Sequence, residues 1–70
     1  MGKHAFRWTF GSGNYIDVYK NDIACVHFNY DNRLKVTVAW SASYLNSDEW
    51  EQVLTCVKEA KAILKKIRSI

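Results

Sequence analysis

Apolar and polar residues alternate through the first forty positions with the period of two that is typical of β-strands. Clusters of Gly, Asn, Asp and Lys interrupt this alternation, and such residues tolerate the backbone angles of tight turns. The interruptions lie at residues 11–14, 20–22 and 31–32. We therefore predict strands over residues 4–10, 14–20, 23–30 and 33–40, with Tyr44 as the outer limit of the last. The short connections indicate successive antiparallel hairpins.

The apolar period changes to three or four residues in the last third of the chain, which predicts one amphipathic helix over residues 47–68. The stripe consists of Trp50, Leu54, Val57, Leu64 and Ile67, widened by Val53, Ala60 and Ile63. Asn46 is the predicted N-cap, and Glu49 three residues later completes a capping box. Acidic residues near the start and basic residues near the end complement the helix dipole.

Together these elements predict a single α+β domain over residues 1–70, a four-stranded antiparallel meander followed by a C-terminal helix packed on one face. The helix should cover the more apolar face of the sheet, whose members share one strand parity. That face comprises Phe6, Trp8, Phe10, Ile16, Val18, Val26, Phe28, Leu34, Val36 and Val38. The opposite face comprises Arg7, Thr9, Tyr15, Asp17, Tyr19, Cys25, His27, Asn29, Lys35 and Thr37.

The opposite face mixes aromatic rings with cations and amides, and the chain carries a net charge of +3. Both features favour an acidic partner, and the rings favour single-stranded nucleic acid, because bases stack on them while cations meet phosphates. Tyr and Thr are also good strand formers, so an ordinary half-exposed sheet face explains the same composition. The candidate nucleic-acid-binding residues are Arg7, Tyr15, Tyr19, Lys20, His27, Asn29, Arg33, Lys35 and Trp40. Simple alternation points Trp40 with Val36 and Val38, and a bulge near Ser41 would change that.

The junction between the last strand and the helix resembles the positive cofactor four family. Residues 44–50 read Tyr-Leu-Asn-Ser-Asp-Glu-Trp, with the Leu-Asn pair and the acidic pair plus aromatic residue at matching places. The resemblance implies a homodimer that binds single-stranded DNA through its sheets, with a role in transcription or replication. The family's Lys/Gly-rich last strand has no counterpart in residues 38–43, which contain no cation. Arg7, Lys20, Arg33 and Lys35 would therefore have to supply the charge.

Other chemistry is weakly indicated. Cys25 and His27 share a strand parity, but a metal site needs at least three ligands and His4 is the only further candidate, so we predict no metal and no cofactor. No pair of carboxylates is suited to acid–base catalysis, so an enzyme is not expected. Cys25 and Cys56 are interpreted as free thiols in a reducing cytoplasm, because the start of the chain has no apolar signal region.

Two alternatives to nucleic-acid binding remain open. The same aromatic and Arg-containing face could bind a protein, for example as a phage-encoded inhibitor or adaptor of a host protein. The chain could also be a structural subunit that only self-associates. The basic helix end could meet a membrane or a nucleic-acid backbone, although we interpret it as a solvated face that completes the helix dipole. Its residues are Lys58, Lys61, Lys65, Lys66 and Arg68.

Overall fold

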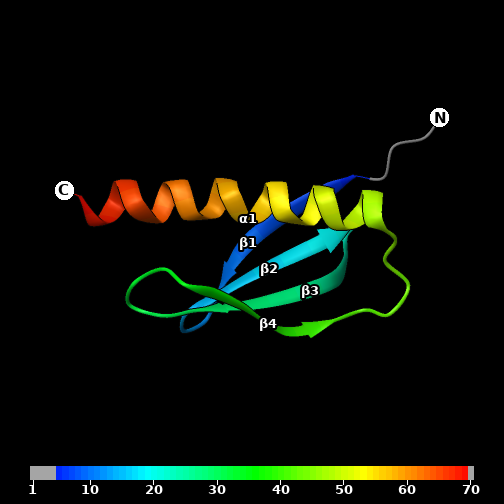
Figure 1. Cartoon of the computed structure of the whole chain (residues 1–70), viewed down its shortest axis with the longest axis horizontal. Helices are drawn as coiled ribbons and strands as arrows, with labels where there is room; N and C mark the ends of the chain where they lie inside the picture. The colour runs from blue at the N-terminus through cyan, green and yellow to red at the C-terminus, as the bar shows by residue number, and fades with distance from the viewer. Residues whose placement is uncertain (1–4, 70) are drawn as a thin grey trace.

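Three short turns fold the first part of the chain into a meander of four antiparallel strands, and a long helix returns across it. The computed structural model describes residues 5–69. The elements are β1 (Phe6–Gly11), β2 (Tyr15–Lys20), β3 (Ile23–Tyr30), β4 (Val36–Ser41) and α1 (Ser47–Arg68). The strand order in the sheet is β1-β2-β3-β4, and α1 lies against one face, over β1 and β2 (Figure 1). The predicted α+β fold class is confirmed.

The bounds of β3 and α1 match the prediction, and the main difference lies at the start of β4. The strand begins at Val36, because the Asp31 carboxylate accepts backbone N–H groups from Arg33 at 2.8 Å and from Lys35 at 2.9 Å. Leu34 adopts a φ of 62° within this turn, a conformation that a strand does not allow. Arg33 and Lys35 therefore lie in the β3–β4 turn and not in a strand. His4, at the predicted start of the first strand, lies outside the described residues.

Two β-bulges change which side chains share a face. Val18 pairs with Val26 but Tyr19 pairs with Ala24, which leaves Cys25 as the extra residue of β3. His27 pairs with Trp40 but Phe28 pairs with Val38, which leaves an extra residue in β4. Because a bulge shifts the alternation by one position, the first one buries Cys25 completely beneath α1. The prediction that Cys25 shares the face of His27 is therefore wrong.

The second bulge, at Ala39, places Trp40 beside His27, on the face away from α1. The two ring centroids lie 5.4 Å apart. The bulge therefore determines the orientation of Trp40. It places the Trp40 ring with the candidate binding residues and not with Val36 and Val38.

The core lies between α1 and the sheet. Its buried residues are Ile16, Val18, Cys25, Val26, Phe28, Tyr30, Leu34, Val53, Cys56, Val57, Ala60 and Leu64. Three predicted members of the helix stripe are exposed instead, Leu54 at 50%, Ile63 at 43% and Ile67 at 57%. A single helix about 10 Å wide also cannot cover four strands spaced about 4.8 Å apart, and α1 packs mainly on β1 and β2, so apolar side chains of the other strands stay partly uncovered. Val38 of β4 is exposed for this reason, and Phe10 near the end of β1 is exposed as well.

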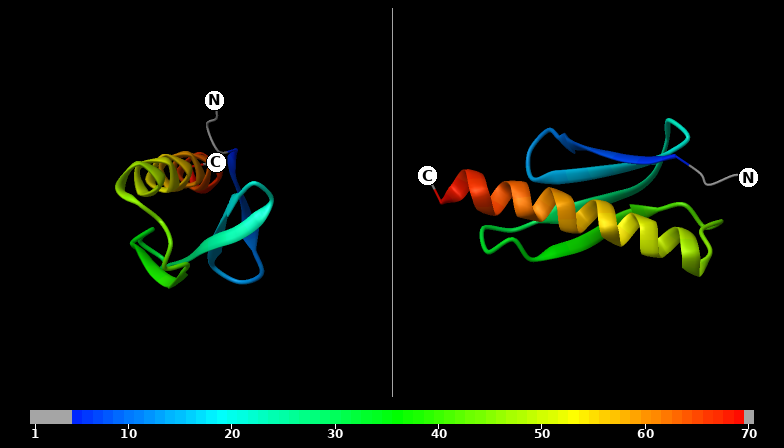
Figure 2. Two further views of the ribbon diagram at one scale, coloured as in Figure 1. Left: turned by 90° about the vertical axis from the view of Figure 1, so that its right-hand side faces the viewer. Right: turned by 90° about the horizontal axis from the view of Figure 1, so that it is seen from above.

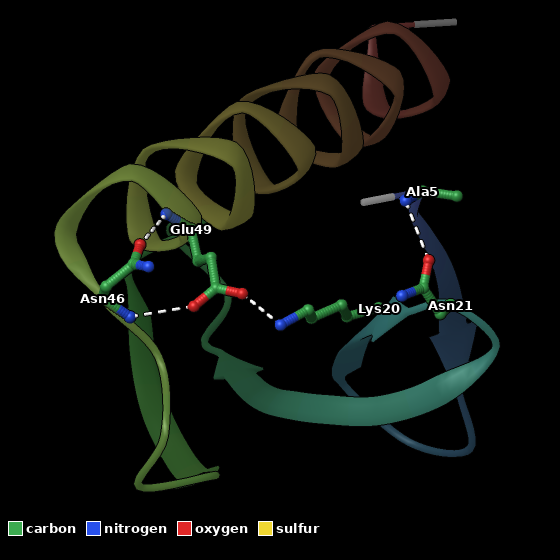
Figure 3. Close-up of polar contacts among 5 residues, drawn as sticks. All are labelled: Ala5, Lys20, Asn21, Asn46 and Glu49. Carbon is green, nitrogen blue, oxygen red and sulfur yellow. Dashed lines mark hydrogen bonds and ion pairs between the residues drawn. The ribbon is translucent and has the colours of Figure 1, made fainter. Parts of the chain in front are cut away.

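The start of α1 is held by the predicted capping box. The Asn46 side chain accepts the backbone N–H of Glu49 at 2.8 Å, and the Glu49 carboxylate accepts the backbone N–H of Asn46 at 3.0 Å (Figure 3). The other Glu49 oxygen accepts the ammonium group of Lys20 at the end of β2. Both side chains are largely buried, at 14% exposed for Lys20 and 9% for Glu49. This ion pair fastens the end of β2 to the beginning of α1.

Candidate functional site

The sheet face turned away from α1, called the open face below, carries its side chains in rows that run across the strands. One row pairs Tyr15 of β2 with Asn29 of β3 and Thr37 of β4. The next row pairs Asp17 with His27 and Trp40, and a third pairs Arg7 with Tyr19. Among residues 5–69, the side chains of the open face are those of Arg7, Thr9, Tyr15, Asp17, Tyr19, Ala24, His27, Asn29, Thr37 and Trp40.

The middle row forms a connected polar and aromatic unit. His27 Nδ1 lies 2.7 Å from Asp17 Oδ1, and the His27 ring is tilted against the Trp40 ring. Because a carboxylate only accepts, Nδ1 donates the proton, which leaves Nε2 as an acceptor in the neutral ring and a donor in the charged one. Gly11 makes room for this unit, since a Cβ there would lie 2.7 Å from Asp17 Oδ2.

The Arg7 side chain has two partners, the Tyr19 ring and the Asp22 carboxylate. Its guanidinium carbon lies 4.7 Å from the centroid of the Tyr19 ring, and its Nε donates to Asp22 Oδ1 at 3.0 Å. Asp22 balances the Arg7 charge locally, although an exposed pair of this kind contributes only about 0 to 1 kcal/mol. Asp17 carries one further negative charge, so Arg7 gives the open face no excess of positive charge.

The rings that remain available to a ligand are those of Tyr15, which is 39% exposed, and Trp40, which is 49% exposed. They come from β2 and β4, so β3 lies between them with Asn29 and His27. Flat, separated rings with amide and imidazole groups between them can stack on planar groups and hydrogen-bond to their edges.

Three of the predicted binding residues lie away from the open face. Lys20 points to the α1 side, where it bonds to Glu49 and lies 5.1 Å from the centroid of the Tyr44 ring. Arg33 and Lys35 are exposed in the β3–β4 turn, at one end of the sheet. The open face therefore gathers six of the nine predicted residues. Arg33 and Lys35 were misplaced by the strand assignment, whereas Lys20 lies in its predicted strand but bonds to Glu49 on the α1 side. The six are Arg7, Tyr15, Tyr19, His27, Asn29 and Trp40.

Sequence reasoning did not identify Asp17 as the partner of His27. In a regular hairpin around residues 21 and 22, the pairing of Lys20 with Ile23 would place Asp17 opposite Val26. The bulge at Cys25 shifts the register by one residue and brings His27 opposite Asp17. No Gly or turn-forming residue adjacent to Cys25 indicates this bulge, so the contact between Asp17 and His27 could not be predicted from the sequence.

Neither thiol lies on the open face, because Cys25 of β3 is covered by α1 and Cys56 belongs to the buried side of α1. Cys25 and Cys56 are both free and buried. Burial raises the pKa of each thiol above its ordinary value; for Cys25 the nearby Lys20 charge opposes this and Glu49 adds to it. Within residues 5–69 no three His, Cys, Asp or Glu side chains are arranged to hold a metal ion.

We expect the native protein to resist labelling by a thiol reagent such as dithionitrobenzoate at pH 8, and to react at both cysteines once denatured. Labelling requires opening of the core, and each 1.4 kcal/mol of opening free energy slows it about tenfold. Stopped-flow absorbance with and without urea measures this. A fast native reaction of one thiol would show that the core is open at that position.

Comparison with protein-family models, with curated proteins and with solved structures finds no match for this chain. The chain is therefore described by its structure alone: a β-meander with a C-terminal helix and one sheet face that carries aromatic rings and is not covered by α1. The resemblance to the positive cofactor four family stays a prediction that depends on the strand-to-helix junction. Over residues 5–69, no helix has both the length and the apolar composition needed to span a bilayer.

Proposed function

We propose that this chain is a small single-stranded nucleic-acid-binding protein that receives bases on its open face. The observation that supports the proposal best is the presence of two exposed rings, Tyr15 and Trp40, on the sheet face that α1 leaves uncovered. Each stacked base contributes roughly 1 to 3 kcal/mol on such rings. Asn29 and His27 lie between them and can hydrogen-bond to base edges.

A single strand suits this surface better than a duplex. Readers of the duplex major groove insert a helix or a β-ribbon, whereas α1 packs along the opposite side of the sheet and leaves a broad, flat face. In a duplex the bases are stacked on each other and cannot reach Tyr15 or Trp40. We propose single-stranded DNA and RNA equally, because stacking on Tyr15 and Trp40 and hydrogen bonds to base edges suit both.

We also propose that the chain acts as a homodimer. A 70-residue domain buries little surface by itself, and exposed apolar side chains remain on the α1 side, among them Val38, Leu54 and Ile67. A second copy covering this side would leave both open faces free. Light scattering should then give twice the chain mass of 8.1 kDa.

A fluorescence anisotropy titration with a labelled oligo-dT strand at two salt concentrations tests the proposed function. We expect binding at micromolar protein that weakens as salt rises, with a log–log slope of about −0.7 per neutralised phosphate. A duplex of the same length should bind more weakly. Absence of binding at low salt, together with a protein partner that survives nuclease treatment in a pull-down, would instead support a protein-binding module.

A further inference from the structure

The positive charge of the chain is concentrated toward one end of the molecule. The β3–β4 turn, residues 31–35, and the second half of α1, residues 58–68, contain seven of the ten basic residues and two of the seven acidic ones. These two segments, called the basic pole below, thus have a formal net charge of +5, and the rest of the sequence has a formal net charge of −2. Its cations are Arg33, Lys35, Lys58, Lys61, Lys65, Lys66 and Arg68.

The two segments of the basic pole are brought together by the fold. The β3–β4 turn and the C-terminal end of α1 lie at the same end of the molecule in two views (Figure 1 and Figure 2). Arg68 Nη1 donates to the Asn32 carbonyl oxygen at 2.5 Å, and Leu34 is buried in the same core as Leu64. The positive charge therefore forms one surface built from two elements, and not only the end of one helix.

Both acidic side chains of the basic pole, Asp31 and Glu59, accept hydrogen bonds from other residues of the domain. The Asp31 carboxylate accepts the backbone N–H groups of Arg33 and Lys35, and these bonds hold the pKa of Asp31 below its ordinary value. Glu59 accepts the indole N–H of Trp8 at 3.1 Å. The Asp31 bonds also order the turn, so that its two cations are presented from a fixed backbone.

We propose that the basic pole binds the phosphate backbone of the same strand whose bases stack on the open face. This inference rests on the proposed function and adds a phosphate site that the open face lacks, since Arg7 is balanced there by Asp22. The row of Tyr15, Asn29 and Thr37 is the one next to the β3–β4 turn. A strand that leaves this row therefore meets Arg33 and Lys35 first and the cations of α1 beyond them.

An anionic membrane is the competing partner for a basic helix with exposed apolar residues, and Ile63 and Ile67 are such residues here. The observation that favours nucleic acid is the position of Arg33 and Lys35. They come from a turn of the sheet and connect the cations of α1 to the aromatic rows, whereas a membrane-binding helix uses its own polar face.

The test compares two variants on two probes at two salt concentrations. The triple variant Arg33→Gln, Lys65→Gln, Lys66→Gln removes three exposed charges and spares Arg68, which ties the turn to α1. The variant Trp40→Ala removes a stacking ring. The probes are an oligo-dT strand and an abasic strand of equal length, and vesicles containing anionic lipid serve as a third surface. Circular dichroism verifies the fold of each variant.

We expect the triple variant to lose at least about tenfold in affinity for both strands and to reduce the salt slope by about two. Trp40→Ala should weaken binding of oligo-dT but not of the abasic strand. Wild-type binding to oligo-dT that the triple variant leaves unchanged would overturn the phosphate site while the proposed function stands. No binding of either strand by the wild type, with or without binding to vesicles, would overturn both.

Discussion

Replacing Glu49 by glutamine is expected to lower the free energy of unfolding by about 3 to 5 kcal/mol, because it leaves the Lys20 ammonium buried without a counter-charge. Lys20 and Glu49 are 14% and 9% exposed, so water screens the pair only weakly. Glutamine is also accepted in a capping box, so the cap with Asn46 can persist. A domain of this size rarely exceeds about 3 to 5 kcal/mol in total stability, and the variant should be largely unfolded at 25 °C.

Two further variants separate the charge effect from general damage. Glu51→Gln removes an exposed carboxylate from the same helix turn and should change stability by less than about 0.5 kcal/mol. The double variant Lys20→Met, Glu49→Gln removes the stranded ammonium and should recover most of the loss. Urea unfolding followed by circular dichroism measures all three. If Glu49→Gln is no less stable than Glu51→Gln, the ion pair does not hold β2 to α1 as described.

Replacing Trp40 by alanine is expected to reduce affinity for an oligo-dT strand by about 1 to 3 kcal/mol, which corresponds to roughly 5- to 150-fold. The indole is 49% exposed on the open face and contacts His27. Truncation removes a stacking surface without opening the core, so the fold should be preserved. Anisotropy titration of the labelled strand measures the change.

Gln52→Ala is the matched control, because Gln52 is exposed on α1, away from the open face, and belongs neither to the apolar side chains of the proposed dimer nor to the basic pole. Its affinity for the strand should equal that of the wild type. Trp40→Phe keeps a ring and should recover most of the lost affinity. Equal losses in Trp40→Ala and Gln52→Ala would show that the strand does not recognise the open face.

Features that depend on local sequence were predictable. The capping box, the change of apolar period at residue 47 and the turn around residues 21 and 22 each have residues with a strong local preference, and α1 and β3 have the predicted bounds. The choice of the covered face also followed, because the alternation in β2 is uninterrupted: Ile16 and Val18 are fully buried.

Features that depend on pairing between strands were not predictable. The bulges at Cys25 and Ala39 depend on how neighbouring strands pair. The first places Cys25 on the face covered by α1, and the second places Trp40 on the open face. The turn at residues 31–32 is confirmed, but residues 33–35 resemble the start of a strand because Leu34 and Val36 preserve the alternation. The backbone N–H groups of Arg33 and Lys35 donate to the Asp31 carboxylate instead, which extends the turn to residue 35. Lys20 was assigned to the binding surface because its buried partner, Glu49, is twenty-nine positions away.

The proposed function divides nucleic-acid binding between the open face and the basic pole. The open face has rings and little net charge, and the basic pole has cations and few rings. We therefore propose that stacking and phosphate contacts belong to separate surfaces, and each can be removed by mutation without the other.

The most direct measurement is a ¹⁵N–¹H correlation spectrum recorded while an oligo-dT strand is added. The three tryptophans give three indole signals, and Trp50 lies in the first turn of α1, outside both the open face and the basic pole. Binding on the open face predicts that the Trp40 indole and the backbone amides of Tyr15 and Asn29 shift, while the Trp50 indole and the Val53 amide do not. A bound strand that leaves the Trp40, Tyr15 and Asn29 signals unchanged would contradict the account.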